Sequence, residues 1–259
     1  MTAESSARNS LERALKLLEI IGRTPGGLSN KEISARLGIA TSSSSYILSR
    51  LEREGYVERR ESGRYEIGLK VLALASGVLR QLGFHHSAAP VLHRLTSATG
   101  LSSCVGVLAR GRMLVVEQVE SPDFIRPDID IGTEHPAYST SIGKMLLAHL
   151  PPTELMAFIE PRELSARTPH TIVSKARLRQ ELLEIQRAGF AVSEEEEFVG
   201  VRALAAPIPQ ADGAVRAAVS LAGPAASPAW RDFPALIAML QVAGRDISRN
   251  SRFRGSEHG

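Results

Sequence analysis

The amino-acid sequence predicts an α+β protein built from a small N-terminal part and a larger C-terminal part. The apolar residues of the first third recur at helical spacing, and after Gly55 the period changes to that of short strands. From about residue 84 onward, the expected helices and antiparallel strands are mixed, as in an α+β domain. The charge changes there too: residues 1–83 contain 13 Lys and Arg against 9 Asp and Glu, a balance of +4, whereas residues 84–259 have a balance of −1. A basic first third indicates an anionic partner.

The composition excludes several classes of protein. Of the 259 residues, 43% are apolar and 23% charged, which is unlike a disordered or fibrous chain. No stretch approaches the roughly 18 uncharged apolar residues that a membrane helix needs, and the first residues lack the apolar core of a signal peptide. The single cysteine, Cys104, excludes an internal disulfide and a multi-cysteine zinc site. We therefore expect a cytoplasmic protein with no membrane partner, no metal and no cofactor.

Three helices are predicted in the first third, with the approximate ranges 11–21, 30–37 and 41–54. Ser10 is the expected N-cap of the first helix. Ser29 stands three residues before Glu32, which is the spacing of a capping box at the start of the second helix. Thr41 is the expected N-cap of the third helix, and Gly55 ends it in the left-handed conformation.

A hairpin follows these helices. Residues 56–60 and 64–67 are short β-like runs on either side of the turn at residues 61–63. The order helix, helix, tight turn, helix, hairpin is that of a winged helix-turn-helix, a fold that binds duplex DNA. Residues 68–83 are rich in Leu, Val and Ala, and they predict a connecting helix.

The C-terminal part predicts helices and strands in alternation. Helices are expected at 90–99, 139–150, 174–188 and 233–248, and strands at 101–108, 113–119, 190–192, 204–208 and 214–221. We predict four segments: a DNA-binding domain at 1–67, a connecting helix at 68–83, a sensor domain at 84–250, and a polar, disordered tail at 251–259.

With these residues laid out, the chain resembles the IclR family of bacterial transcriptional regulators over roughly 230 residues. The resemblance rests on the joint order of short motifs at 10–15, 32–39, 48–57, 65–68, 139–148, 168–172, 189–195 and 205–208. It implies a winged helix-turn-helix joined by a helix to a GAF-like effector-binding domain. It also implies a homodimer or homotetramer that controls a catabolic operon in response to a small molecule.

The third helix predicts the surface that contacts DNA. If Ile47, Leu48 and Leu51 are buried, the polar residues near the helix start face outward, where hydroxyl groups can donate to phosphates or base edges. The predicted DNA contacts are Ser42, Ser43, Ser45, Tyr46 and Arg50 on this helix and Arg59, Arg60 and Arg64 at the hairpin. Relatives in the family often have Arg at the position of Tyr46, and Tyr cannot bind guanine through two hydrogen bonds. The alternatives are a merely polar helix start and a solvated hairpin.

A second set of residues predicts an effector pocket. Ser139, Thr140 and Ser141 open a helix whose first N–H groups could receive a carboxylate, although simple helix capping is the alternative. The resemblance places the ligand beside Gly132, Ser139, Thr140, Ser141, Ser193, Ala203, Ser220 and Ala222. Because Ala203 and Ala222 offer no polar group, we expect a less polar pocket. The hypothesis is a repressor that senses a small organic or aromatic acid.

Other patterns suggest chemistry more weakly. Ser141 and Lys144 match the Ser-x-x-Lys pattern of serine β-lactamases, so a serine hydrolase is the alternative function, but no Lys-Thr-Gly sequence accompanies them. The run Glu194–Glu197 is expected to form a solvated loop. His85, His86 and His93 lack zinc-ligand spacing, and we expect Cys104 to be an inert core thiol.

Overall fold

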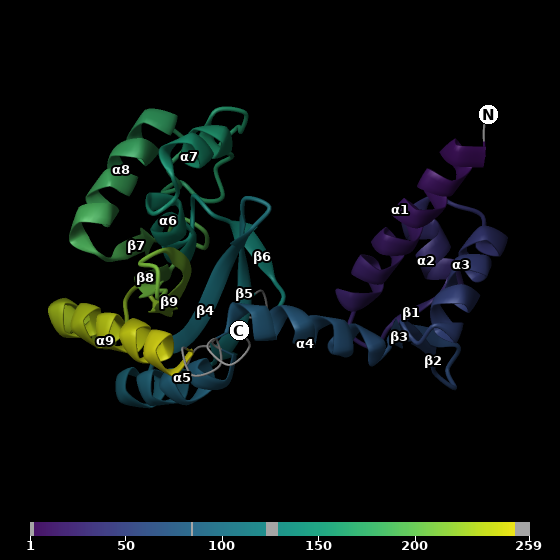
Figure 1. The fold of residues 1–259 in the computed structure, drawn as a ribbon, viewed down its shortest axis with the longest axis horizontal. Coiled ribbons are helices and arrows are strands. Elements are labelled where there is room, and N and C mark those ends of the chain that lie inside the picture. The colour runs from purple at the N-terminus through teal and green to yellow at the C-terminus, as the bar shows by residue number, and fades with distance from the viewer. Residues whose placement is uncertain (1–2, 84, 123–128, 252–259) are drawn as a thin grey trace. The chain divides into compact units, whose positions relative to one another are not determined.

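The computed structural model describes residues 3–83, 85–122 and 129–251. Apart from Ser251, the predicted tail at 251–259 lies outside these residues. The chain divides into two compact units, Met1–Gln81 and Leu82–Gly259, which we call unit 1 and unit 2 (Figure 1).

Unit 1 confirms the predicted winged helix-turn-helix. Its elements are α1 (Ala3–Gly22), β1 (Leu28–Ser29), α2 (Asn30–Leu37), α3 (Thr41–Arg53), β2 (Val57–Arg59), β3 (Arg64–Ile67) and α4 (Lys70–Leu82). The three strands form a small sheet in the order β1-β3-β2, in which β3 is antiparallel to both neighbours. A core of apolar side chains, among them Leu17, Ile33 and Leu48, joins the helices to this sheet.

Local signals set most boundaries in unit 1. The capping box is present, because the Ser29 backbone N–H donates to Glu32 Oε2 over 2.8 Å and the Ser29 hydroxyl accepts from the Glu32 N–H. Gly55 has a φ of 77°, which places it in the left-handed region expected after α3. Two predicted caps are wrong. Ser10 lies inside α1, which begins at Ala3, and α3 starts after Ala40 without a side-chain cap.

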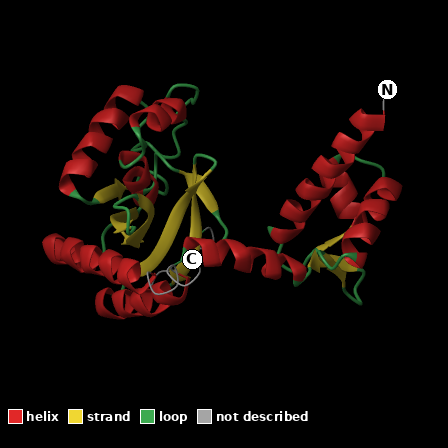
Figure 2. Ribbon diagram, in the orientation of Figure 1, coloured by secondary structure: helices red, strands yellow, loops and turns green. Residues whose placement is uncertain are grey.

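Unit 2 confirms the α+β prediction. Its elements are α5 (His85–Thr99), β4 (Ser102–Ala109), β5 (Arg112–Val119), β6 (Glu134–Pro136), α6 (Ser141–Ala148), α7 (Pro152–Ile159), α8 (Lys175–Ala188), β7 (Ala191–Glu194), β8 (Val201–Pro209), β9 (Val215–Pro224), the 3-10 helix η1 (Pro228–Asp232) and α9 (Phe233–Ser251). Figure 2 shows the strands between two groups of helices. They form one antiparallel sheet in the order β6-β5-β4-β9-β8-β7.

The two faces of this sheet have different coverings. Helices α5 and α9 pack on one face and α6 and α8 on the other (Figure 1). The alternation along β9 shows this division: Val219 and Leu221 belong to the α5–α9 core, whereas Ala218 belongs to the α6–α8 core. The sheet face under α6 carries the candidate pocket.

Three features of unit 2 differ from expectation. Helix α5 begins at His85 and includes Pro90, which was expected to start it. Pro152 begins α7, a helix that was not predicted; the fixed φ of proline suits the first turn of a helix. The short strand β6 was not predicted, because three residues are too few to show a period.

Candidate functional site

Helix α3 exposes a polar surface at its N-terminal half. Ser42, Ser43, Ser45, Tyr46 and Arg50 are all exposed, while Ser44 between them is buried. No serine caps the helix, so these hydroxyl groups are not engaged in N-capping. The first turn contains no acidic residue, and the positive end of the helix dipole therefore lies beside uncharged hydroxyls.

Tyr46 and Arg50 form one unit on this surface. The Arg50 guanidinium lies 4.8 Å from the centre of the Tyr46 ring, which is a cation–π contact. The Tyr46 side chain is 56% exposed, so the stacked pair is open to a partner. The spacing of four residues brings the two side chains to the same face of α3.

The three arginines of the hairpin are not equivalent. Arg59 is exposed, with its guanidinium 5.8 Å from the Tyr65 ring centre. Arg60 pairs with Glu66 over 2.6 Å, and this hydrogen bond raises the pKa of Arg60. Arg64 is more deeply engaged: it donates to the carbonyl oxygen of Gly27 over 2.8 Å and pairs with Glu32 over 3.3 Å.

Unit 2 contains a cavity on the α6 side of its sheet. The cavity has about 730 Å³ of unfilled space, part of it open to solvent. Six of the predicted effector contacts line it: Thr140, Ser141, Ser193, Ala203, Ser220 and Ala222. Gly132 and Ser139 are not part of this lining. Met113, Ile129, Ile142 and Val201 contribute apolar wall.

At the start of α6, a side chain caps the helix and the backbone packs closely against the preceding segment. The Thr140 hydroxyl accepts from the Gly143 N–H over 3.1 Å, so Thr140 supplies the cap that was the alternative interpretation of this segment. A Cβ at Gly143 would lie 2.2 Å from the Ala137 carbonyl oxygen, and only glycine therefore fits there.

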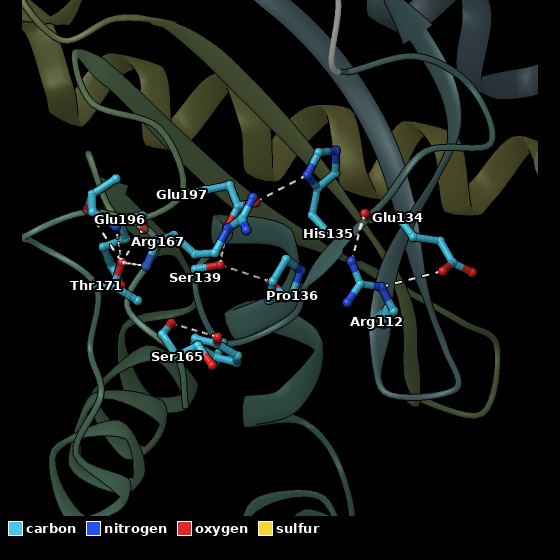
Figure 3. A network of polar contacts seen from close by, with 12 residues as sticks. Arg112, Glu134, His135, Pro136, Ser139, Ser165, Arg167, Thr171, Glu196 and Glu197 are labelled. Atoms are coloured by element: carbon cyan, nitrogen blue, oxygen red, sulfur yellow. Dashed lines mark hydrogen bonds and ion pairs between the residues drawn. The ribbon is translucent and has the colours of Figure 1, made fainter. Parts of the chain in front are cut away.

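A buried polar network borders the cavity through His135 and Glu197 (Figure 3). Ser139 is fully buried and donates to Glu197 Oε2 over 2.5 Å. The same carboxylate lies 3.4 Å from Nδ1 of His135 and 3.4 Å from Nε of Arg167. Ser139 thus supports the cavity from behind by holding Glu197, which itself lines the cavity.

The prediction of a solvated loop at Glu194–Glu197 is wrong for two of its members. Glu196 and Glu197 are only 6% and 7% exposed. Glu195 has a left-handed φ of 56°, which turns successive side chains in different directions. The Thr171 hydroxyl donates to the Glu196 carbonyl oxygen over 2.6 Å and fixes this turn.

Glu196 takes part in a second buried ion pair. Lys144 on α6 is fully buried, and its Nζ lies 2.5 Å from Glu196 Oε1 and 2.8 Å from Glu181 Oε1. Burial raises the pKa of Glu196, and the opposing charge of Lys144 partly offsets that effect. Lys144 is therefore held by two carboxylates.

Several cavity residues were not predicted. His135, Glu197, Gln118 and Cys104 all line the cavity. Cys104 is buried as expected, and burial raises the pKa of its thiol, but it faces the cavity beside Ser220. Strand alternation could have indicated its orientation, because Cys104 and Ser220 are cross-strand neighbours.

Neither a membrane span nor a metal cluster is found in the described part of the chain. None of the described helices combines the length and apolar character that a span needs. Among the described residues, no three His, Cys, Asp or Glu side chains gather as metal ligands. The side chains of His85 and His86 lie outside the described part.

Comparison with known proteins agrees with this architecture. The family model described as the C-terminal domain of the bacterial transcriptional regulator IclR matches residues 76–249, and the IclR helix-turn-helix model matches residues 10–61. The chain is 30% identical over 246 residues to the HTH-type transcriptional regulator BhcR of Paracoccus denitrificans, covering 95% of this chain and 88% of that protein. It is 28% identical over 218 residues to the transcriptional repressor IclR of Escherichia coli, covering 83% and 80%.

Solved structures show the same fold. The crystal structure of IclR from Thermotoga maritima has a TM-score of 0.77 at 29% identity and covers 94% of this chain and 99% of that one. An IclR homologue from Microbacterium hydrocarbonoxydans, crystallised with 4-hydroxybenzoate, has a TM-score of 0.84 at 22% identity, with 94% and 99% covered. The alternative of a serine hydrolase is wrong, because the family is not enzymatic. The chain belongs to the IclR family of bacterial transcriptional regulators.

Proposed function

We propose that this regulator is a repressor of a catabolic operon and that a small organic or aromatic acid, bound in the cavity of unit 2, changes its affinity for DNA. The observation that carries the proposal is the coexistence of two surfaces in one chain. Unit 1 has an exposed polar face on α3, and unit 2 has a cavity with a buried polar wall. The relative in Escherichia coli is a transcriptional repressor, and the Microbacterium homologue binds 4-hydroxybenzoate.

The predicted contacts remain the basis of the DNA-binding proposal. The α3 residues would lie in a major groove of the operator duplex, and the hairpin would contact the adjacent backbone. We propose 1–67 as the DNA-binding domain, 68–83 as the connection and 84–250 as the effector-binding and oligomerisation domain. The protein would act in the cytoplasm.

We also propose that the chain acts as a homodimer or homotetramer. Unit 1 carries exposed apolar side chains that its own core does not cover: Leu11, Leu15, Leu69, Leu72, Leu74 and Val78, each between 54% and 75% exposed. Leu11 and Leu15, which lie on α1, are outside the apolar core of unit 1. A second copy is the occupant we propose, because operator-binding dimers need two recognition helices in fixed register.

A salt titration of the full-length protein tests DNA binding. The probe is a duplex from the DNA beside its own gene, with a scrambled duplex as control. We expect log affinity to fall linearly with log salt, by about 0.9 per phosphate contact, and we expect the natural duplex to bind more tightly. Equal affinity for both duplexes, or affinity that salt does not change, would contradict the proposal.

A ligand screen tests the regulatory half. Carboxylic and aromatic acids are ranked by the thermal shift of the full-length protein, because a ligand of the folded state raises stability by mass action. The best ligand should change operator affinity about 5- to 150-fold, the usual range of coupling. A stabilising ligand that leaves operator affinity unchanged would contradict control by the cavity.

A further inference from the structure

The ring of His135 is placed so that one nitrogen is held by the protein and the other is left for a ligand. His135 lies in β6 and lines the cavity, and only 7% of the residue is exposed. Nδ1 faces the Glu197 carboxylate over 3.4 Å. Nε2 is buried and has no hydrogen-bond partner among the residues that the structure describes. A buried polar atom without a partner costs free energy, so a group that satisfies Nε2 would bind favourably.

We propose that His135 is the anchor of a monocarboxylate effector, and that binding takes up one proton on its imidazole ring. This inference rests on the function proposed above and names the chemistry of its ligand. The proton comes from solvent and is held on Nε2, which then donates to the carboxylate of the ligand. No covalent bond forms or breaks in the ligand.

Glu197 determines which form of the ring the cavity presents. A carboxylate can only accept hydrogen bonds, so Nδ1 must carry its hydrogen toward Glu197. In the neutral ring, Nε2 is then a lone pair that repels an anion. In the protonated ring, Nε2 is an N–H donor that attracts one, and Glu197 stabilises this cation from the other side.

Charge balance shows why a proton is needed. Among the described residues, the cavity lining contains two carboxylates, Glu120 and Glu197, and no Lys or Arg. Arg167 already compensates Glu197 from outside the lining over 3.4 Å. A ligand carboxylate therefore brings an uncompensated negative charge into a partly buried space, which is costly. A protonated His135 restores neutrality.

The other charged groups around His135 already have polar partners. Arg112 at the start of β5 pairs with Glu134 over 3.4 Å, beside His135 in the sequence. Glu120, beyond the end of β5, accepts from Gln118 Nε2 over 3.1 Å and is exposed at the mouth. The cap of α6 adds a weaker attraction, because the first N–H groups of a helix carry partial positive charge. His135 carries the only imidazole ring among the described lining residues.

The experiment compares benzoate with benzamide, its neutral analogue of the same shape, on the full-length protein. Calorimetry at about pH 6 and about pH 8, in two buffers of different ionisation enthalpy, measures affinity and proton uptake. We expect benzoate affinity to fall by up to about 10-fold per pH unit above the titration midpoint of the free ring, with uptake of about one proton. Benzamide should show neither effect. The ring titration of His135, followed by NMR, should move to higher pH when benzoate saturates the protein.

The matched variants are His135→Gln and His170→Gln. His170 is exposed and outside the cavity lining, so its variant should behave like the parent. His135→Gln should abolish proton uptake and the pH dependence of benzoate affinity. If that variant fails to fold, the NMR titration of the parent protein still decides.

Several outcomes would overturn the inference. These are benzoate affinity equal at both pH values, benzamide binding as tightly as benzoate, no benzoate binding at either pH, or pH dependence that survives His135→Gln. None of these results would contradict the proposals of DNA binding and of control by another ligand, because the salt titration and the ligand screen test those separately.

Discussion

The exposed face of α3 and the buried wall of the unit 2 cavity present polar groups in opposite ways. Ser42, Ser43 and Tyr46 are exposed to solvent. In unit 2, Lys144 and Glu196 are buried and held by partners from other elements. The difference follows from the partner: DNA brings its own dense charge to a solvated surface, whereas a small ligand must be satisfied by groups that are already fixed and desolvated.

This contrast has an energetic consequence. Removing one exposed side chain from α3 should change the DNA binding of unit 1 and leave the unit folded. Removing one member of a buried ion pair in unit 2 should change folding, because the remaining charge is left without compensation. Unfolding and DNA-binding measurements on single variants separate these two kinds of effect.

The largest expected effect is that of Lys144→Met. The substitution preserves much of the side-chain volume but leaves Glu196 buried without its closest cation. We expect the free energy of unfolding of unit 2 to fall by about 3–5 kcal/mol, measured by denaturant titration. Lys175→Met is the control, because Lys175 Nζ donates to the Glu160 carbonyl oxygen in an exposed hydrogen bond.

The same variant has a predicted pH dependence. Burial already raises the pKa of Glu196, and loss of Lys144 should raise it further. A carboxyl group whose folded-state pKa lies above its unfolded value gives stability at low pH that is lost as pH rises through the folded value. The deficit of Lys144→Met should therefore shrink as pH falls from about 7 toward about 5. A deficit that grows on acidification would contradict the buried pair.

Tyr46→Ala should have an intermediate effect, on specificity alone. Tyr46 is 56% exposed, so we expect no loss of stability. Removal of its ring also removes the support of Arg50. Discrimination between the natural and scrambled duplexes should fall by about 1–3 kcal/mol, measured by competition binding. Tyr46→Phe keeps the ring, so it should retain the share of this discrimination that comes from stacking against Arg50. If Tyr46→Ala lowered the affinity for every duplex equally, Tyr46 would instead contact the phosphate backbone of the DNA.

The sequence predicted the features of this molecule that depend on near neighbours. The capping box of Ser29 and Glu32 spans three residues, and the left-handed Gly55 needs only its own missing side chain. These signals are local, and together with the resemblance they established the fold and six residues of the cavity lining.

The polar wall of the cavity could not be predicted in the same way. Lys144 and Glu196 are 52 residues apart, and His135 and Glu197 are 62 apart. A run of four glutamates is usually solvated, and only partners brought by the fold can bury two of them. His135 lies in a strand of three residues, too short for any periodic signal. Burial of charge is thus a property of tertiary structure.

The smallest expected effects distinguish two arginines of the hairpin, both predicted to contact DNA. Arg64 donates to the Gly27 carbonyl oxygen and pairs with Glu32, but its side chain is 39% exposed, so solvent screens much of this interaction. Arg64→Ala should lower the free energy of unfolding of unit 1 by about 1 kcal/mol.

Arg59 is exposed and free of such bonds to carbonyl oxygens in the described structure, so Arg59→Ala should leave stability unchanged and reduce the salt slope by about 0.9. Thermal unfolding and the salt titration of both variants provide the measurements. If Arg64→Ala reduces the salt slope without changing stability, Arg64 gives up its bonds within unit 1 and binds a phosphate instead. Arg59 and Arg64 would then make the same kind of contact with DNA.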